Sequence, residues 1–285
     1  MNRARRLQET RESWNFATRL HNAHKRDQAG FLRSGGSTLF PEELALLGDL
    51  TDRRLLHVLS NAGQDTLSLA ARGARAVGVD LSDEAIAFAR DLSVKSGIPA
   101  TFHRGEILEV LESDLEPEPF DVVFGSYGCL VWIEDLARFF RGVFGRLARG
   151  GRLVIVEFHP IAWSFGDRFE LRDPYFASGQ VFSSPVGDYV GEAGGALSPS
   201  GHLEAPPISN PHAAHAYQHP VGSIVSHLLD AGFVLEALRE WPYANGCRLH
   251  PGLVRAEGQR FTTPPAVPNL PLMLGLAARR PQEAG

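Results

Sequence analysis

The most informative stretch of the chain runs from Arg54 to Asp80 and reads RLLHVLSNAGQDTLSLAARGARAVGVD. Residues 54–59 and 74–80 are short apolar runs of the kind found in buried strands. Between them, residues 65–71 are typical of a short helix that packs one face against the sheet. A strand, a helix and a second strand in this order predict a βαβ unit of a parallel sheet.

The same alternation continues to residue 158. Ser82 is well placed to cap a helix that follows the second strand. Further strands are predicted at residues 100–103, 120–124 and 152–158, and a further helix at residues 135–148. Five strands joined by helical crossovers predict a doubly wound α/β sheet.

The flanking segments differ from this core. Residues 1–50 are expected to be mainly helical and to close over a ligand site. Residues 51–285 would form the main domain, in which the stretch 160–220, rich in proline and glycine, would be an insertion that covers a substrate. A helix at 221–231 and strands at 233–238 and 270–278 complete the prediction.

Composition limits the choice of partners and compartment. The chain of 285 residues has a formal net charge of −5, which disfavours sequence-independent binding to nucleic acid. Its two cysteines, Cys129 and Cys247, are far apart, which fits a reducing compartment. No apolar run approaches the ~20 residues that a bilayer requires, and no apolar stretch follows the basic N-terminus as in a secretory signal. We therefore expect a cytoplasmic monomer or homodimer without a membrane or nucleic-acid partner.

Ligands of an open α/β sheet bind at the carboxyl ends of its strands, so the residues there are candidate site residues. The first predicted strand is followed by SNAGQD (60–65), and the second ends at Asp80, which can accept two hydrogen bonds from a ribose diol. Alternatively, Asp80 would only cap the following helix, and Asp65 would only place a negative charge at a helix N-terminus. Glu106, after the third strand, would otherwise be a solvated strand-end charge.

Five pieces of sequence together resemble the core of class I S-adenosylmethionine-dependent methyltransferases. They are LLHVLSNAGQDTLSLA, AVGVDLSDEAIAFAR, FHRGEI, FDVVFGSYGCL and GGRLVIVEFHP. The later pieces AGFVLEALREWPY and LPLMLGLAARR resemble the terminal hairpin strands of that family. The resemblance implies a Rossmann-like sheet of seven strands, the last one antiparallel, and S-adenosylmethionine as the cofactor.

The resemblance also implies a set of cofactor-binding residues. Asp80 would hold the ribose hydroxyls, Glu106 and Ile107 the adenine edge, and Ser126 with Tyr127 the sulfonium end. Trp14, on an N-terminal helix, would close over the cofactor. The full set of expected cofactor-binding residues is Trp14, Ser60, Asn61, Ala62, Gly63, Asp65, Asp80, Leu81, Gly105, Glu106, Ile107, Ser126 and Tyr127.

The first loop departs from the family pattern of an acidic residue followed by glycines at alternate positions. This chain has His57, Leu59, Asn61 and Gly63 there, so the cofactor's amino group needs another partner. Nicotinamide dinucleotide binding is the nearest rival for the architecture, but it requires a GxGxxG loop. The loop lacks that spacing, and Asp65 suits a positively charged sulfonium better than a pyrophosphate.

Candidates for acid–base chemistry are Tyr127 and His159, although an imidazole before Pro160 is equally suitable as a structural group. Residues 210–219 are predicted to form a short helix with His212, His215 and His219 on one face. We interpret that face as a polar lining and expect no metal, because no carboxylate or thiolate completes a ligand set locally.

These observations favour a methyltransferase that acts on a nitrogen, oxygen or sulfur atom of a small metabolite. One alternative is an enzyme that uses S-adenosylmethionine without methylating, for example by intramolecular cyclisation that releases methylthioadenosine. Another is a non-catalytic module that only binds the cofactor.

Overall fold

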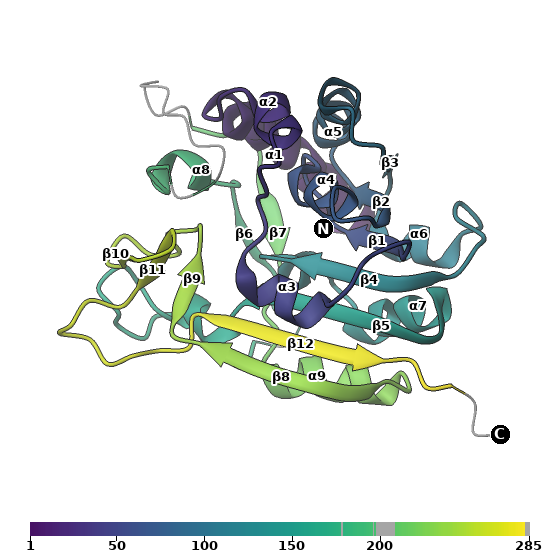
Figure 1. The fold of residues 1–285 in the computed structure, drawn as a ribbon. Helices are drawn as coiled ribbons and strands as arrows, with labels where there is room; N and C mark the ends of the chain where they lie inside the picture. The colour runs from purple at the N-terminus through teal and green to yellow at the C-terminus, as the bar shows by residue number, and fades with distance from the viewer. Residues whose placement is uncertain (178, 196, 198–208, 283–285) are drawn as a thin grey trace.

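The computed structural model describes residues 1–177, 179–195, 197 and 209–282 (Figure 1). Its helices are α1 (Arg3–Ala23), α2 (Gln28–Arg33), α3 (Pro41–Leu47), α4 (Gln64–Ala70), α5 (Asp83–Ser96), α6 (Ile107–Glu112), α7 (Leu136–Arg146), α8 (Tyr189–Glu192) and α9 (Val221–Asp230), with 3₁₀ turns η1 (Leu130–Trp132) and η2 (Pro160–Ser164). Its strands are β1 (Arg54–Val58), β2 (Arg75–Asp80), β3 (Thr101–Arg104), β4 (Phe120–Ser126), β5 (Leu147–Phe158), β6 (Phe182–Ser184), β7 (Ala214–Ala216), β8 (Val234–Trp241), β9 (Tyr243–Asn245), β10 (Val254–Ala256), β11 (Arg260–Thr262) and β12 (Met273–Arg279).

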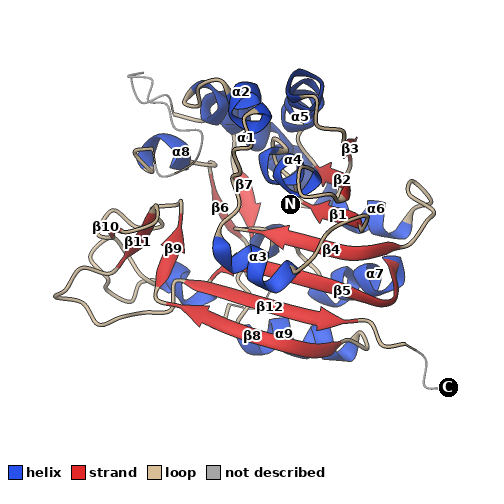
Figure 2. Ribbon diagram, viewed as in Figure 1, coloured by secondary structure: helices blue, strands red, loops and turns tan. Residues whose placement is uncertain are grey.

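A seven-stranded sheet forms the centre of the molecule, in the order β3-β2-β1-β4-β5-β12-β8 (Figure 2). The first five of these strands are parallel to their neighbours, whereas β12 is antiparallel to both β5 and β8. This confirms the predicted doubly wound sheet with an antiparallel last strand. The order reverses between β1 and β4, and their carboxyl ends therefore mark the expected ligand crevice.

The central strand β4 is buried on both faces, because its successive side chains point to opposite faces of the sheet and helices cover each face. In β4, Val122 and Phe124 belong to the apolar cluster on the face covered by α3, whereas Val123 belongs to the cluster on the face covered by α7 and α9. The continuous apolar character of the strand follows from this arrangement.

The prediction of a helix over residues 210–219 is wrong. Asn210 is buried, and its amide donates hydrogen bonds to Ser13 and to the carbonyl of Val186. Residues 214–216 form β7, which pairs with β6. These tertiary contacts override the local capping pattern, so His212, His215 and His219 do not share a helical face.

The flanking segments agree with the prediction in type but differ in detail. The first fifty residues contain α1, α2 and α3, as expected, and β5 begins at Leu147 rather than at Arg152. The small sheets β6–β7 and β9–β10–β11 were not anticipated. Pro206 and Pro207 of the predicted insertion lie outside the described residues. None of the helices that the structure describes is long and apolar enough to cross a membrane.

Candidate active site

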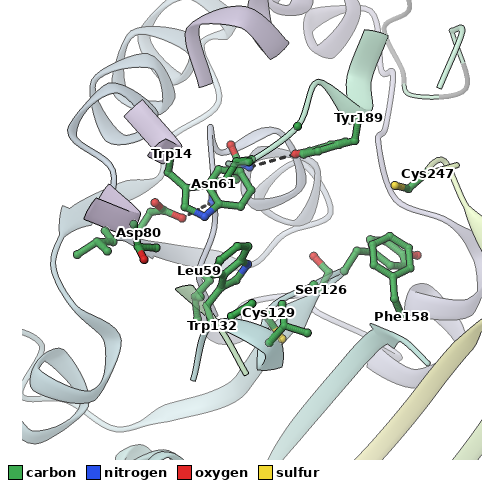
Figure 3. A pocket seen from close by; sticks show the side chains of 18 of the residues that line it. Trp14, Leu59, Asn61, Asp80, Ser126, Cys129, Trp132, Phe158, Tyr189 and Cys247 are labelled. Carbon is green, nitrogen blue, oxygen red and sulfur yellow. Dashed lines mark hydrogen bonds between the residues drawn. The ribbon is translucent and has the colours of Figure 1, made fainter. Parts of the chain in front are cut away.

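A cavity of about 720 Å³ lies at the carboxyl ends of β1, β2 and β4. One wall comes from α1, and a second comes from residues 182–187 together with residues 215–218. Figure 3 shows side chains that line this cavity, with Trp14 and Asp80 at one end and Phe158 and Cys247 at the other. The expected cofactor-binding residues that line it are Trp14, Ser60, Asn61, Ala62, Asp65, Asp80, Leu81, Gly105, Glu106, Ile107, Ser126 and Tyr127.

Asp80 lies at the end of β2, where its carboxylate organises the loop above it. The backbone N–H of Asn61 donates to Oδ2 and that of Ser82 donates to Oδ1, each at 2.8 Å. Burial raises the pKa of Asp80 to about 6, although these backbone donors favour the ionised form. Nearby, the hydroxyl of Ser60 is buried and has no hydrogen-bond partner among the described residues. An acceptor carboxylate beside a buried hydroxyl without a partner fits a ligand that carries hydroxyl groups, such as a nucleoside.

The loop after β1 follows an unusual backbone path. Leu59, Asn61 and Gly63 all have positive φ, at 51°, 47° and 79°. A Cβ on Gly63 would come within 2.7 Å of Ala89 and 2.9 Å of the Phe102 ring, so packing against α5 and β3 requires glycine there. Gly63 therefore contributes through the shape of the loop and does not line the cavity.

His57 occupies the position at which the resembling family has an acid. The ring is buried, and burial lowers its pKa to about 4, so that it is neutral at physiological pH. Its Nδ1 lies 2.8 Å from Thr66 Oγ1, and its Nε2 lies 3.3 Å from Ser126 Oγ. A neutral imidazole thus connects β1 with α4 and with the end of β4.

Asp65, in the first turn of α4, places a carboxylate next to Ser126 at the end of β4. Thr38 Oγ1 donates to Oδ1 at 2.6 Å, and Ser126 Oγ donates to Oδ2 at 3.3 Å. Since Ser126 donates to Asp65, the network assigns the proton of the His57 ring to Nε2. The carboxylate is therefore oriented by two hydroxyl groups and faces the cavity.

Glu106 follows the end of β3 and lines the cavity. Its carboxylate caps α6 by accepting from the backbone N–H groups of Leu108 and Glu109, each at 3.1 Å. Arg3 of α1 forms an ion pair with it at 2.8 Å. The side chain is thus a helix cap that also ties α1 to the rim of the cavity.

Tyr127 lies where the cavity meets an aromatic wall. Its ring centroid is 5.6 Å from that of Phe158 and 6.2 Å from that of Phe40. Asn245 Nδ2 donates to its hydroxyl oxygen at 3.0 Å. Burial and the nearby carboxyl of Glu43 raise the pKa of Tyr127 well above its ordinary value, so the phenol stays protonated at neutral pH.

His159 does not line the cavity. Its Nε2 lies 2.8 Å from Glu240 Oε1, and its Nδ1 accepts from the backbone N–H of Ile161 as the cap of η2. These contacts correspond to the structural interpretation of the imidazole, and a catalytic role for His159 stays a prediction that its position does not favour.

The structure adds wall residues that the sequence did not single out. Trp132 makes an edge contact with Trp14, with ring centroids 5.5 Å apart. Tyr189 accepts from Asn61 Nδ2 at 3.4 Å, and Lys25 and Asn245 also line the cavity. A basic run, HKR at residues 24–26, is the only signal near Lys25, and it does not distinguish that lysine from its neighbours.

Residues 56–151 match the family described as a methyltransferase domain. No curated protein matches the sequence. The CcbJ methyltransferase from Streptomyces caelestis is similar in structure, with a TM-score of 0.57 and 15% identity over 96% of this chain and 99% of that chain. A putative S-adenosylmethionine-dependent methyltransferase from Listeria monocytogenes has a TM-score of 0.54 and 17% identity over 85% of this chain and 97% of its own.

A third similar structure is an S-adenosylmethionine-dependent methyltransferase from Mesorhizobium loti. Its TM-score is 0.52, with 21% identity over 86% of this chain and 99% of that chain. These similarities establish the fold of S-adenosylmethionine-dependent methyltransferases for the chain. Within it, residues 56–151 match a methyltransferase domain.

Proposed function

We propose that the chain transfers the methyl group of S-adenosylmethionine to a nitrogen, oxygen or sulfur atom of a small metabolite. The observation that carries this proposal is that one continuous cavity has both a polar end and an aromatic end. One enclosure contains the polar end at Asp80 and Glu106 and the aromatic end at Tyr127, Phe158 and Trp163. Its volume of about 720 Å³ lies in the upper half of the range of ~300–1,000 Å³ for small-molecule sites, which leaves room for a second ligand beside a nucleoside.

The residues of the polar end fit the cofactor. Asp80 can accept from the ribose diol, and the carboxylates of Asp65 and Asp80 suit a ligand that carries a positive charge. The rings of Trp14 and Trp132 line the same end of the cavity, where an aromatic ring can contact a cation. When bound, the cofactor supplies an activated methyl group on a sulfonium.

The residues of the aromatic end would hold the acceptor. Since methyl transfer is an in-line displacement, the protein's task is to align the acceptor atom and to exclude water. Tyr127, protonated and fixed by Asn245, can orient an acceptor by donating a hydrogen bond. The walls from α1 and from residues 182–187 and 215–218 shield the site from solvent, in keeping with a covering role for residues 1–50 and 160–220.

Product analysis tests the proposal. The protein is incubated with S-adenosylmethionine and a metabolite extract, and the nucleoside product is identified by mass spectrometry. S-adenosylhomocysteine that forms only when the extract is present would support methyl transfer to a metabolite. Methylthioadenosine formed without extract would contradict it and favour cyclisation, and the absence of either product would favour a binding module.

A further inference from the structure

The chain lacks the acidic residue of the family pattern, which would stand at position 57, yet two side chains of opposite charge line the same cavity. They are the carboxylate of Asp65 and the ammonium of Lys25, which come from α4 and from the turn after α1. Burial lowers the pKa of Lys25 to about 8, and Asp65 counteracts this shift. Two charges that share a shielded cavity interact more strongly than they would in water.

The turn that carries Lys25 is tied to the residue next to Asp65. Gln64 Nε2 donates to Asn22 Oδ1 at 3.0 Å and to Gln28 Oε1 at 2.7 Å. Asn22 and Gln28 lie three residues before and after Lys25. This amide cluster therefore holds the ammonium and the carboxylate in a fixed relation to each other.

Both charges keep capacity for a ligand. Thr38 and Ser126 each donate one hydrogen bond to Asp65, which leaves two of the roughly four acceptor positions of a carboxylate. Within the described residues, no ion pair or hydrogen bond of Lys25 Nζ is found. The side chain is half-buried and lines the cavity, so its three donors can reach a ligand there.

We propose that Asp65 and Lys25 form a binding site for an α-amino-acid zwitterion, in which Asp65 holds the ammonium group and Lys25 the carboxylate group. This inference rests on the proposed function, since the zwitterion is the amino-acid end of the cofactor. The site replaces the missing acid at position 57, where the neutral His57 orients Ser126 and thereby Asp65. Because Asp65 holds the amino group protonated, the site also opposes attack by that amine within the cofactor.

Four adenosine ligands that carry different charged groups at this end test the site by isothermal titration calorimetry, each ligand being compared between wild type and variant. S-adenosylhomocysteine and S-adenosylmethionine carry the whole zwitterion, decarboxylated S-adenosylmethionine carries only the ammonium, and methylthioadenosine carries neither group. Asp65→Asn should weaken binding of the first three ligands by at least about tenfold, because a charge-assisted hydrogen bond is lost. Lys25→Gln should weaken only the first two by a similar factor, and neither variant should change binding of methylthioadenosine.

Matched controls separate the site from general charge effects and from misfolding. Arg26→Gln removes an exposed cation one residue from Lys25, and Asp91→Asn removes an exposed carboxylate of α5 outside the cavity. Both controls should bind all four ligands as the wild type does, and Lys25→Arg should restore most of the affinity for S-adenosylhomocysteine.

Two outcomes overturn the inference while leaving the proposed function standing. In the first, Asp65→Asn and Lys25→Gln bind S-adenosylhomocysteine with wild-type affinity. In the second, they lose affinity for methylthioadenosine to the same degree. A wild-type protein that binds neither S-adenosylhomocysteine nor methylthioadenosine would instead contradict the proposed function itself.

Discussion

At the scale of single residues, the residues that line the cavity divide into those that the sequence predicted and those that it did not. Asp80 and Glu106 were found from sequence because a strand end fixes where its next side chain lies. Lys25 and Asn245 were not, because their places in the cavity depend on how α1 and β9 pack against the sheet. His57 is intermediate, since its position was anticipated but its link to Ser126 required coordinates.

Cofactor binding should depend on pH through Asp80. Because the pKa of Asp80 is raised to about 6, lowering the pH from 7 to 5 protonates this acceptor and should weaken S-adenosylhomocysteine binding by about tenfold. Titration calorimetry across this range measures the effect. Asp80→Asn should bind more weakly at pH 7 and show a flat profile between pH 5 and 7, and an unchanged slope in this variant would rule Asp80 out as the titrating group.

The same ionisation should act on folding with the opposite sign. A raised folded-state pKa means that the ligand-free native state binds the proton more tightly than the unfolded chain, so the contribution of Asp80 to stability grows as the pH falls from above 6 toward 4. Asp80 thus favours folding under the acidic conditions in which it disfavours the cofactor.

Tyr127→Phe should separate acceptor alignment from cofactor binding. The substitution keeps the ring between Phe158 and Phe40 but removes the hydroxyl that Asn245 holds. We expect kcat to fall by about tenfold, in line with the loss of one positioning hydrogen bond, while S-adenosylhomocysteine affinity stays within about twofold. Once an acceptor is known, steady-state kinetics and calorimetry test this, and an unchanged kcat would exclude a role for the hydroxyl in turnover.

At the scale of elements, α1 is joined to the segment that precedes β7. Asn210 donates from its amide to the carbonyl and the hydroxyl of Ser13 and to the carbonyl of Val186, each at 3.0–3.1 Å. The sequence predicted the strands of the large sheet because their apolar patterns are local, and it predicted a mainly helical segment over residues 1–50. It mispredicted residues 210–219 because their conformation depends on contacts with α1, almost two hundred residues away in the chain.

Asn210→Ala should destabilise this junction. It leaves buried acceptors without a donor, which costs about 2–3 kcal/mol of unfolding free energy. Urea unfolding measures the loss, and S-adenosylhomocysteine affinity should fall with it because α1 forms a wall of the cavity. Ser209→Ala, at an exposed neighbouring position, should change stability by less than about 0.5 kcal/mol. Equal effects of the two substitutions would argue against the junction.

At the scale of the whole molecule, the sequence predicted the architecture of the sheet better than the walls of the cavity. Alternating apolar runs predicted a doubly wound sheet and its ligand-binding edge, and the family resemblance implied seven strands. The cavity walls come from α1, from the segments beside β6 and β7 and from residues 245–249, whose apolar periodicity is too short to predict their packing. A cavity assembled from distant segments is a property of the folded molecule as a whole.

Ligand-induced stabilisation should distinguish the cofactor classes. A ligand present at one hundred times its Kd adds about 2.7 kcal/mol to the unfolding free energy, which corresponds to a rise in Tm of about 5 °C or more. S-adenosylhomocysteine should give this rise in a thermal melt. NAD should give none, because the loop after β1 lacks the glycine pattern for a pyrophosphate and Asp65 repels it. A larger shift with NAD would favour the rival cofactor.

The strand order has a consequence for how the chain assembles during synthesis. Within the described residues, β8 joins the large sheet only through β12, which is made later. Until the last strand leaves the ribosome, β5 and β8 each keep an open edge, which is a site for pairing with another nascent chain. β12 therefore holds β8 in the large sheet. Shortening the protein before Met273 would remove β12 and leave β8 without a partner strand, whereas β1 to β5 would stay paired with one another.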